Sequence, residues 1–151
     1  MFYRPSPIDS HSKDIDNVTE GEPFRLFCQT SQNANWKTCQ WRRIPDDGST
    51  GPADCTFTYV RAKKGNVMEI GRSCRGFVAN HVICQFCGGN QNTENNNCEI
   101  KITSANLLDS GKWICRIELC KNDNLGGCKD DEGDGKSFEE SVIVKVFLNL
   151  N

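Results

Sequence analysis

Short segments in which apolar and polar residues alternate run through the chain and predict β-strands. In residues 24–30, Phe24, Leu26 and Cys28 alternate with mainly polar neighbours, which places every second side chain on one face of a strand. Similar patterns predict strands at residues 38–43, 55–61, 66–70, 98–104, 112–119 and 137–148. No segment of about twelve or more residues has apolar positions at helical spacing. Short strands separated by turn signals predict an all-β sandwich or barrel.

Two segments lack this alternation. Residues 1–17 are polar and contain Pro5 and Pro7, so we interpret them as a loose N-terminal leader to one domain that spans residues 18–151. Residues 76–97 are rich in small and amide residues and end in QNTENNN. We interpret this second segment as an insertion between strands. A third segment, residues 120–136, is acidic and glycine-rich, which predicts the tip of a hairpin.

Composition limits the classes of partner. The 18 Lys and Arg residues against 20 Asp and Glu give a net charge of −2, and no stretch forms a basic stripe. Binding to nucleic acid through its phosphates is therefore not expected. A membrane-spanning helix needs about 18 consecutive apolar residues, and the longest apolar tract, residues 141–150, is interrupted by Lys145. Direct membrane insertion is not expected either.

Ten cysteines in 151 residues are the most unusual feature of the composition. An even number of this size in a short chain predicts five disulfides and an oxidising, extracellular compartment. A secreted chain carries an apolar signal segment until it is processed, and none follows Met1. We therefore interpret the sequence as a mature fragment with an added Met1, either secreted or cut from the ectodomain of a membrane protein.

One arrangement of cysteine and tryptophan points to a family. Cys28, Trp41 and Cys115 fall on three predicted strands, and Cys115 ends the segment Asp-Ser-Gly-Lys-Trp-Ile-Cys at residues 109–115. This segment resembles the D-x-G-x-Y-x-C motif of the immunoglobulin superfamily. The resemblance implies a variable-type or intermediate-type Greek-key sandwich of two antiparallel sheets, in which a Cys28–Cys115 disulfide joins the sheets and packs against Trp41. The cysteine pattern is also similar to that of cysteine-rich immunoglobulin-like proteins of arthropods.

The sequence departs from the family pattern at two places. Trp113 replaces the corner tyrosine, and its indole N–H can donate a hydrogen bond but cannot accept one. In the family the corner aspartate, here Asp109, pairs with an arginine at the start of strand D, which implies Arg72 or, as second choice, Arg75. Cys28 and Cys115 are separated by more residues than is usual in the family. The insertion at residues 76–97, between strands D and E and stapled by disulfides, accounts for the excess.

The other cysteines suggest further bridges. Cys39 and Cys98 both point inward by alternation, so a second bridge between the sheets is expected there, with Cys39–Cys74 as the alternative. Cys120 and Cys128 flank a turn and are expected to pair with each other. The four cysteines whose pairing stays open are Cys55, Cys74, Cys84 and Cys87.

Catalytic and metal-binding motifs are weak. Cys84 and Cys87 form a C-x-x-C pair near His81, but structural pairing is the favoured interpretation because the sequence has no redox-type βαβ unit and no second metal half-site. The acidic run at residues 130–135 resembles a calcium loop in composition, yet Ser141 stands where the loop requires a bidentate carboxylate. We therefore expect no enzyme activity, cofactor or metal.

These observations predict an extracellular protein-recognition module: a receptor or adhesion ectodomain, or a secreted immune or signalling binder. Its partner would be another extracellular protein, and homodimerisation stays open. The alternatives are a secreted carrier of a small ligand or ion, and an inhibitor that presents a stapled loop to a protease or toxin. Asn17 heads an N-x-T sequon and is a candidate glycosylation site. The candidate partner-binding residues lie in predicted loops: Trp36, Phe77, His81, Phe86, Asn122, Asp123, Asp130 and Asp131.

Overall fold

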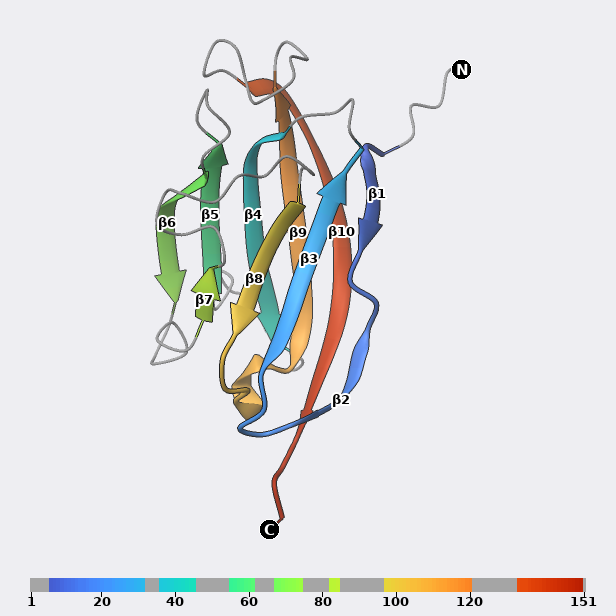
Figure 1. Ribbon diagram of the computed structural model, residues 1–151, viewed down its shortest axis with the longest axis vertical. Coiled ribbons are helices and arrows are strands. Elements are labelled where there is room, and N and C mark those ends of the chain that lie inside the picture. The colour runs from blue at the N-terminus through green and yellow to red at the C-terminus, as the bar shows by residue number, and fades with distance from the viewer. Residues whose placement is uncertain are drawn as a thin grey trace.

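Two β-sheets face each other in the computed structural model (Figure 1), which describes residues 6–31, 36–45, 55–61, 67–74, 82–84, 97–120 and 133–150. The predicted all-β sandwich is confirmed. The four-stranded sheet has the order β1 (Ile8–His11), β3 (Phe24–Thr30), β8 (Asn97–Ile102) and β7 (Val82–Cys84). The six-stranded sheet has the order β2 (Ile15–Thr19), β10 (Gly133–Phe147), β9 (Gly111–Cys120), β4 (Trp36–Pro45), β5 (Cys55–Arg61) and β6 (Val67–Cys74).

Alternation along the strands forms the core between the sheets. On β9, Trp113, Cys115 and Ile117 are buried while Lys112 and Arg116 are exposed. All three tryptophans of the chain are fully buried, and aromatic side chains of this size dominate the burial of apolar area in small domains. Strands β2 and β10 pair in parallel, whereas the other strand pairs are antiparallel.

The prediction of a loose leader is wrong for residues 8–17. Strand β1 pairs with β3 and strand β2 with β10, so the N-terminal segment contributes to both sheets. Side chains add to the backbone pairing where the chain crosses between the sheets. Ser12 Oγ accepts a hydrogen bond from the Phe27 N–H at 2.8 Å, and Asp14 Oδ1 accepts one from the Ile143 N–H at 2.9 Å. Each strand buries only one residue, Ile8 or Val18, so alternation could not reveal either strand.

The segment at residues 76–97 is also not a plain insertion. Residues 82–84 form β7 at the edge of the four-stranded sheet, where Val82 pairs with Ile102 and Cys84 with Ile100, and β8 already begins at Asn97. A strand of three residues is too short to show a period of two. The remainder of the segment, including Cys87, lies outside the described residues.

The helical content of the described residues is a single 3-10 turn, η2 (Leu107–Asp109). Within the same residues, no helix has the length and apolar character needed to cross a membrane.

Candidate functional site

Two disulfides join the sheets at the centre of the sandwich. Cys28 on β3 is bonded to Cys115 on β9, with 6.6 Å between their Cα atoms. Cys39 on β4 is bonded to Cys98 on β8, with 6.5 Å between their Cα atoms. Both are the pairings expected above, and Trp41, which lies opposite Cys115 on the neighbouring strand, is fully buried beside them.

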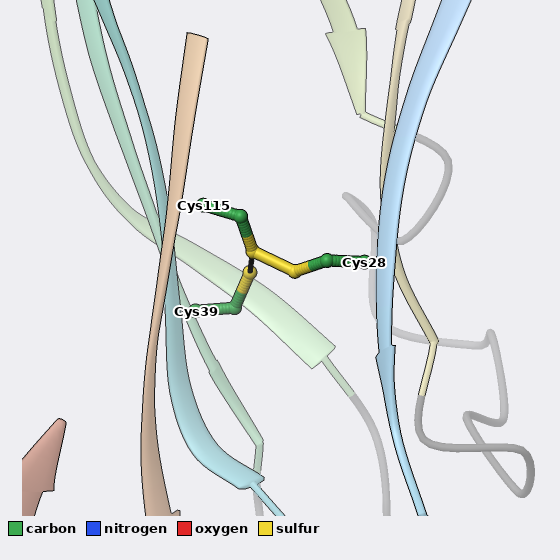
Figure 2. A group of neighbouring side chains, drawn as sticks. All are labelled: Cys28, Cys39 and Cys115. Atoms are coloured by element: carbon green, nitrogen blue, oxygen red, sulfur yellow. Dashed lines mark hydrogen bonds between the residues drawn. A yellow bond between two sulfur atoms is a disulfide. The ribbon is translucent and has the colours of Figure 1, made fainter. Parts of the chain in front are cut away.

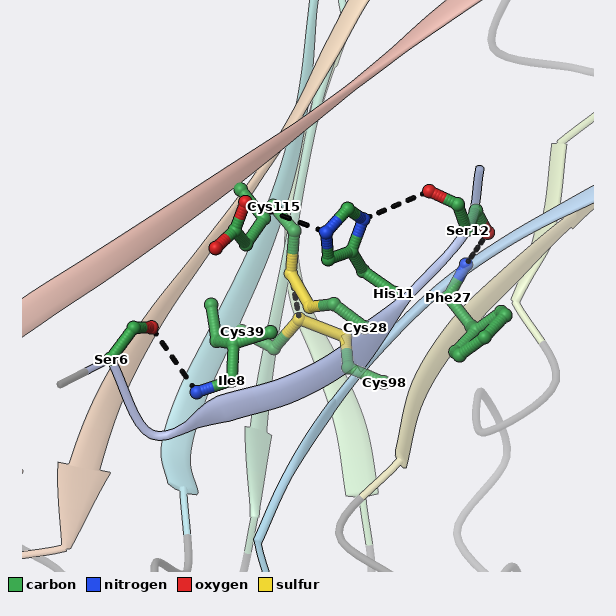
Figure 3. Close-up of a disulfide and its surroundings, with 10 residues drawn as sticks. Ser6, Ile8, His11, Ser12, Phe27, Cys28, Cys39, Cys98 and Cys115 are labelled. Atoms are coloured by element: carbon green, nitrogen blue, oxygen red, sulfur yellow. Dashed lines mark hydrogen bonds and ion pairs between the residues drawn. A yellow bond between two sulfur atoms is a disulfide. The ribbon is translucent and has the colours of Figure 1, made fainter. Parts of the chain in front are cut away.

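The two bridges are in direct contact. Figure 2 shows Cys28 reaching across the sandwich to Cys115, with Cys39 next to them; Cys39 Sγ lies 3.8 Å from Cys115 Sγ. Figure 3 shows the second bridge, to Cys98, in the same place. The sulfur atoms of Cys28, Cys39 and Cys115 lie within 4.8 Å of one another, close enough for a metal. Metal ligation requires thiolates, and these sulfurs are in disulfides, so the cluster serves to cross-link the sheets.

The turn before β9 is held by a network around Asp109. Asp109 Oδ2 accepts a hydrogen bond from the Asn106 N–H at 2.8 Å, and Asn106 Oδ1 accepts one from the Leu108 N–H at 2.9 Å. Trp113 Nε1 donates to the Asp109 carbonyl oxygen at 2.9 Å. The indole N–H therefore donates to a backbone carbonyl four residues upstream. This hydrogen bond satisfies two buried polar groups, the indole N–H and the carbonyl oxygen.

Arg72 is not at the start of a strand in the four-stranded sheet, where the resemblance placed the partner of Asp109. Instead it lies in β6, opposite Phe57 of β5, at the edge of the six-stranded sheet. The hairpin of β5 and β6 continues through Arg72 to Cys74, further than the predicted strand at residues 66–70. Arg75 lies outside the described residues.

The prediction that Trp36 lies in a loop and binds a partner is wrong. It is the first residue of β4 and is fully buried. The pairing of β4 with β9 shifts between Trp36 and Thr38, so that Trp36 and Lys37 are buried in succession. Because two successive residues are buried here, the alternation of apolar and polar residues does not show where β4 begins. The other loop candidates lie outside the described residues: Phe77, His81, Phe86, Asn122, Asp123, Asp130 and Asp131.

The structure places several other predicted residues without testing their roles. Asn17 is exposed on β2, an edge strand. Cys120 at the end of β9 is disulfide-bonded, and its expected partner Cys128 lies outside the described residues. Cys55 and Cys74 face each other in the register of β5 and β6.

The outer face of the six-stranded sheet is a candidate site that the sequence analysis missed. It carries two depressions, of about 260 and 210 Å³. The larger one is lined by Thr38, Gln40, Arg116, Glu118, Gly135 and Ser137. The smaller one is lined by Lys112, Ile114, Glu139, Glu140 and Ser141. Alternation predicts outward positions of this kind, but a solvated face is their ordinary role, so no sequence signal set them apart.

The larger depression lies where two strands depart from regular pairing. The register of β10 against β9 shifts between Gly133 and Ser137, and Gly135 has a φ of 76°, which L-residues rarely adopt. The β4 irregularity ends at Thr38, on the opposite side of the depression. Bulges bend a strand and redirect its side chains, and both irregularities adjoin residues that line this depression.

Comparisons with known proteins support the architecture alone. No protein-family model matches the sequence, and no curated protein matches it. The structure is similar to a chain in a structure described as "Structural basis of T cell specificity and activation by the bacterial superantigen toxic shock syndrome toxin-1". The TM-score is 0.58 at 15% identity, over 91% of this chain and 97% of that chain. Identity this low shows a common fold and carries no function.

Proposed function

We propose that this chain is an extracellular protein-recognition module built on an immunoglobulin-type sandwich of variable topology. The observation that carries the proposal is the strand order. Variable-type domains place strands A, B, E and D in one sheet and strands C′ and C″ beside G, F and C in the other. Assigning β1, β3, β8 and β7 to the first set and β10, β9, β4, β5 and β6 to the second reproduces both orders. In this assignment β1 and β2 together form strand A: β1 lies in the first sheet, and β2 lies in the second sheet.

The central cross-link supports the same assignment. A disulfide between strands B and F with a buried tryptophan of strand C against it is a hallmark of these domains. Cys28, Cys115 and Trp41 have those places in the proposed assignment. The hydrogen bond from Trp113 to the backbone near Asp109 corresponds to the tyrosine corner, with an indole in place of the phenol.

Two features favour an extracellular setting. The disulfides fit an oxidising compartment, because cytosolic thiols are kept reduced. Asn17 of the N-x-T sequon is exposed, so a glycan there has space on the edge of the six-stranded sheet. We infer a glycoprotein that is secreted or displayed at a cell surface.

The outer face of the six-stranded sheet is the recognition surface in this proposal. Strands β4, β9 and β10 lie side by side there (Figure 1) and present exposed or half-buried polar side chains around the two depressions. A rigid, cross-linked sheet holds such side chains in place, which lowers the entropy cost of binding another protein. We assign the chain a binding role in adhesion, signalling or immunity.

A panel of recombinant extracellular proteins, probed with a tetramer of this domain, tests the proposal. Ser141→Arg adds bulk beside the smaller depression, and Ser10→Arg adds the same bulk to exposed residue 10 of β1, on the other sheet. We expect saturable binding to a panel member that Ser141→Arg weakens about tenfold or more, with Ser10→Arg unchanged. Absence of saturable binding contradicts the recognition role. Equal binding by both variants contradicts the assigned face.

A further inference from the structure

Arg116 lines the larger depression of the outer face. It is an exposed, outward residue of β9, and the register places Gln40 of β4 on one side of it and Glu139 of β10 on the other. The depression of about 260 Å³ extends from Arg116 toward Thr38 and Ser137. The space exceeds the size of a single carboxylate, so it also has room for the residues that flank one.

The charge of Arg116 has no partner within the part of the chain that the structure describes. No carboxylate there lies within 4.0 Å of its nitrogens. Glu118, the acidic residue of the same depression, instead accepts a hydrogen bond from the Gly135 N–H at 3.1 Å. This bond directs the Glu118 carboxylate toward the β10 backbone. The guanidinium of Arg116 is therefore not in contact with a carboxylate of the described residues, although Glu118 lines the same depression.

The surrounding side chains complement a carboxylate. A guanidinium presents parallel N–H donors whose spacing matches the two oxygens of a carboxylate. The hydroxyls of Thr38 and Ser137 add neutral groups that can donate hydrogen bonds. We propose that this depression is a binding subsite for a single acidic side chain of the partner protein. The inference rests on the proposed function and names the chemistry of its site.

Nearby acidic residues restrict what can bind. Glu118 lies in the depression and Glu139 faces Arg116 across the β9–β10 pair. Like charges at short range disfavour binding, so these two carboxylates act against a polyanion and favour a basic residue beside the bound acid. The fitting ligand is one Glu or Asp with a neighbouring Lys or Arg, which distinguishes a protein segment from sulfated polysaccharide or nucleic acid.

Titration of the 15N-labelled domain with blocked peptides tests the subsite. The probes are acetyl-Ala-Glu-Lys-Ala-amide and the same peptide with Gln in place of Glu. We expect the Glu peptide to shift the signals of Thr38, Gln40, Arg116 and Ser137, and the Gln peptide to bind about tenfold more weakly or not at all. Arg116→Gln removes the response, whereas Lys145→Gln, which replaces an exposed cation of β10 that lines neither depression, retains it.

Four results overturn the inference. The first is equal binding of the Glu and Gln peptides, and the second is unchanged binding by Arg116→Gln. The third is a response of the same signals to glucuronate but not to the Glu peptide, which would make the ligand an acidic sugar. A panel partner that binds Arg116→Gln as tightly as the parent protein also overturns it, while the proposed function stands. If the Glu peptide binds as expected but no panel protein binds the domain, the subsite is supported and the proposed function is contradicted.

Discussion

His11 and Glu140 connect the two sheets beside the central disulfide. His11 Nε2 lies 3.6 Å from Glu140 Oε2, and Figure 3 shows His11 next to the bridges. His11 lies opposite Cys28 in the register of β1 and β3, and Glu140 lies opposite Cys115 in the register of β10 and β9. The ion pair and the Cys28–Cys115 disulfide therefore join neighbouring strands of the same two sheets at the same level.

We expect the ion pair to contribute little to stability compared with the disulfide beside it. The His11 and Glu140 side chains are 36% and 34% exposed, and pairs in contact with water typically contribute about 0–1 kcal/mol. A double-mutant cycle of His11→Gln and Glu140→Gln, measured by urea unfolding in mildly acidic buffer, gives the coupling energy. The control cycle replaces Glu140→Gln by Glu139→Gln, an exposed neighbour, and shows no coupling. Coupling above about 2 kcal/mol would contradict a solvent-screened pair.

Trp113→Phe is expected to destabilise the domain more than Trp41→Phe. Both indoles are fully buried, so the two changes remove the same volume. Trp113 Nε1 donates to the Asp109 carbonyl, whereas Trp41 Nε1 has no hydrogen-bond partner among the described residues. Loss of the Trp113 bond leaves a buried acceptor unsatisfied, which costs about 1–3 kcal/mol more. Equal free energies of unfolding for the two variants would show that the indole bond contributes nothing.

Ile8→Ala tests the finding that the N-terminal strand belongs to the sandwich. Ile8 is 7% exposed and part of the core, so truncation is expected to reduce the free energy of unfolding by about 2–4 kcal/mol. Asp9→Ala, at the exposed neighbouring position of β1, is the control and should change stability by less than about 0.5 kcal/mol. An Ile8→Ala variant as stable as the parent protein would favour the loose leader after all.

Alternation in the sequence predicted the strands whose apolar residues recur at every second position. Strands β3 and β5 begin and end at the predicted residues, 24–30 and 55–61, because their apolar positions keep a period of two. Strands β1 and β2 did not follow this rule, since each buries one side chain and is held by backbone pairing. Trp36 was misplaced because the pairing irregularity next to it buries two successive residues.

The candidate site could not be predicted in the same way. Arg116 and Gln40 come from strands far apart in the sequence, and only the register of β4 against β9 makes them neighbours. Gly135, which has a positive φ, lines the depression around them, and a glycine in a predicted hairpin does not reveal where the strand bends. The inter-sheet cysteines were easier to predict, because alternation fixes which face each sulfur occupies.

A further disulfide is expected between Cys55 and Cys74. These residues face each other across β5 and β6, and directly opposed residues of antiparallel strands have Cα atoms about 4.5–5.5 Å apart, within the range that a disulfide spans. Peptide mapping should recover Cys55 linked to Cys74. Linkage of Cys74 to Cys84 or Cys87 instead would mean that the edge strand β6 is attached to the segment that follows it.

The fold, the oxidising compartment and the proposed function all depend on the joining of the two sheets by Cys28–Cys115 and Cys39–Cys98. The alternative pairings are close in space, since Cys39 Sγ lies 3.8 Å from Cys115 Sγ and Cys28 lies opposite Cys98 in the strand register. A direct map of the linkages therefore tests the central claim.

Mass spectrometry of a non-reducing digest, made after free thiols are alkylated, gives that map. Trypsin cleaves after Lys37, between Cys28 and Cys39, and after Lys101 and Lys112, between Cys98 and Cys115. A glutamate-specific protease cleaves after Glu94 and separates Cys98 from the preceding cysteines. We predict the peptide pairs Cys28–Cys115 and Cys39–Cys98, with none of the four alkylated. Recovery of Cys28–Cys98 with Cys39–Cys115, or of any of the four as a free thiol, would contradict the sandwich described above.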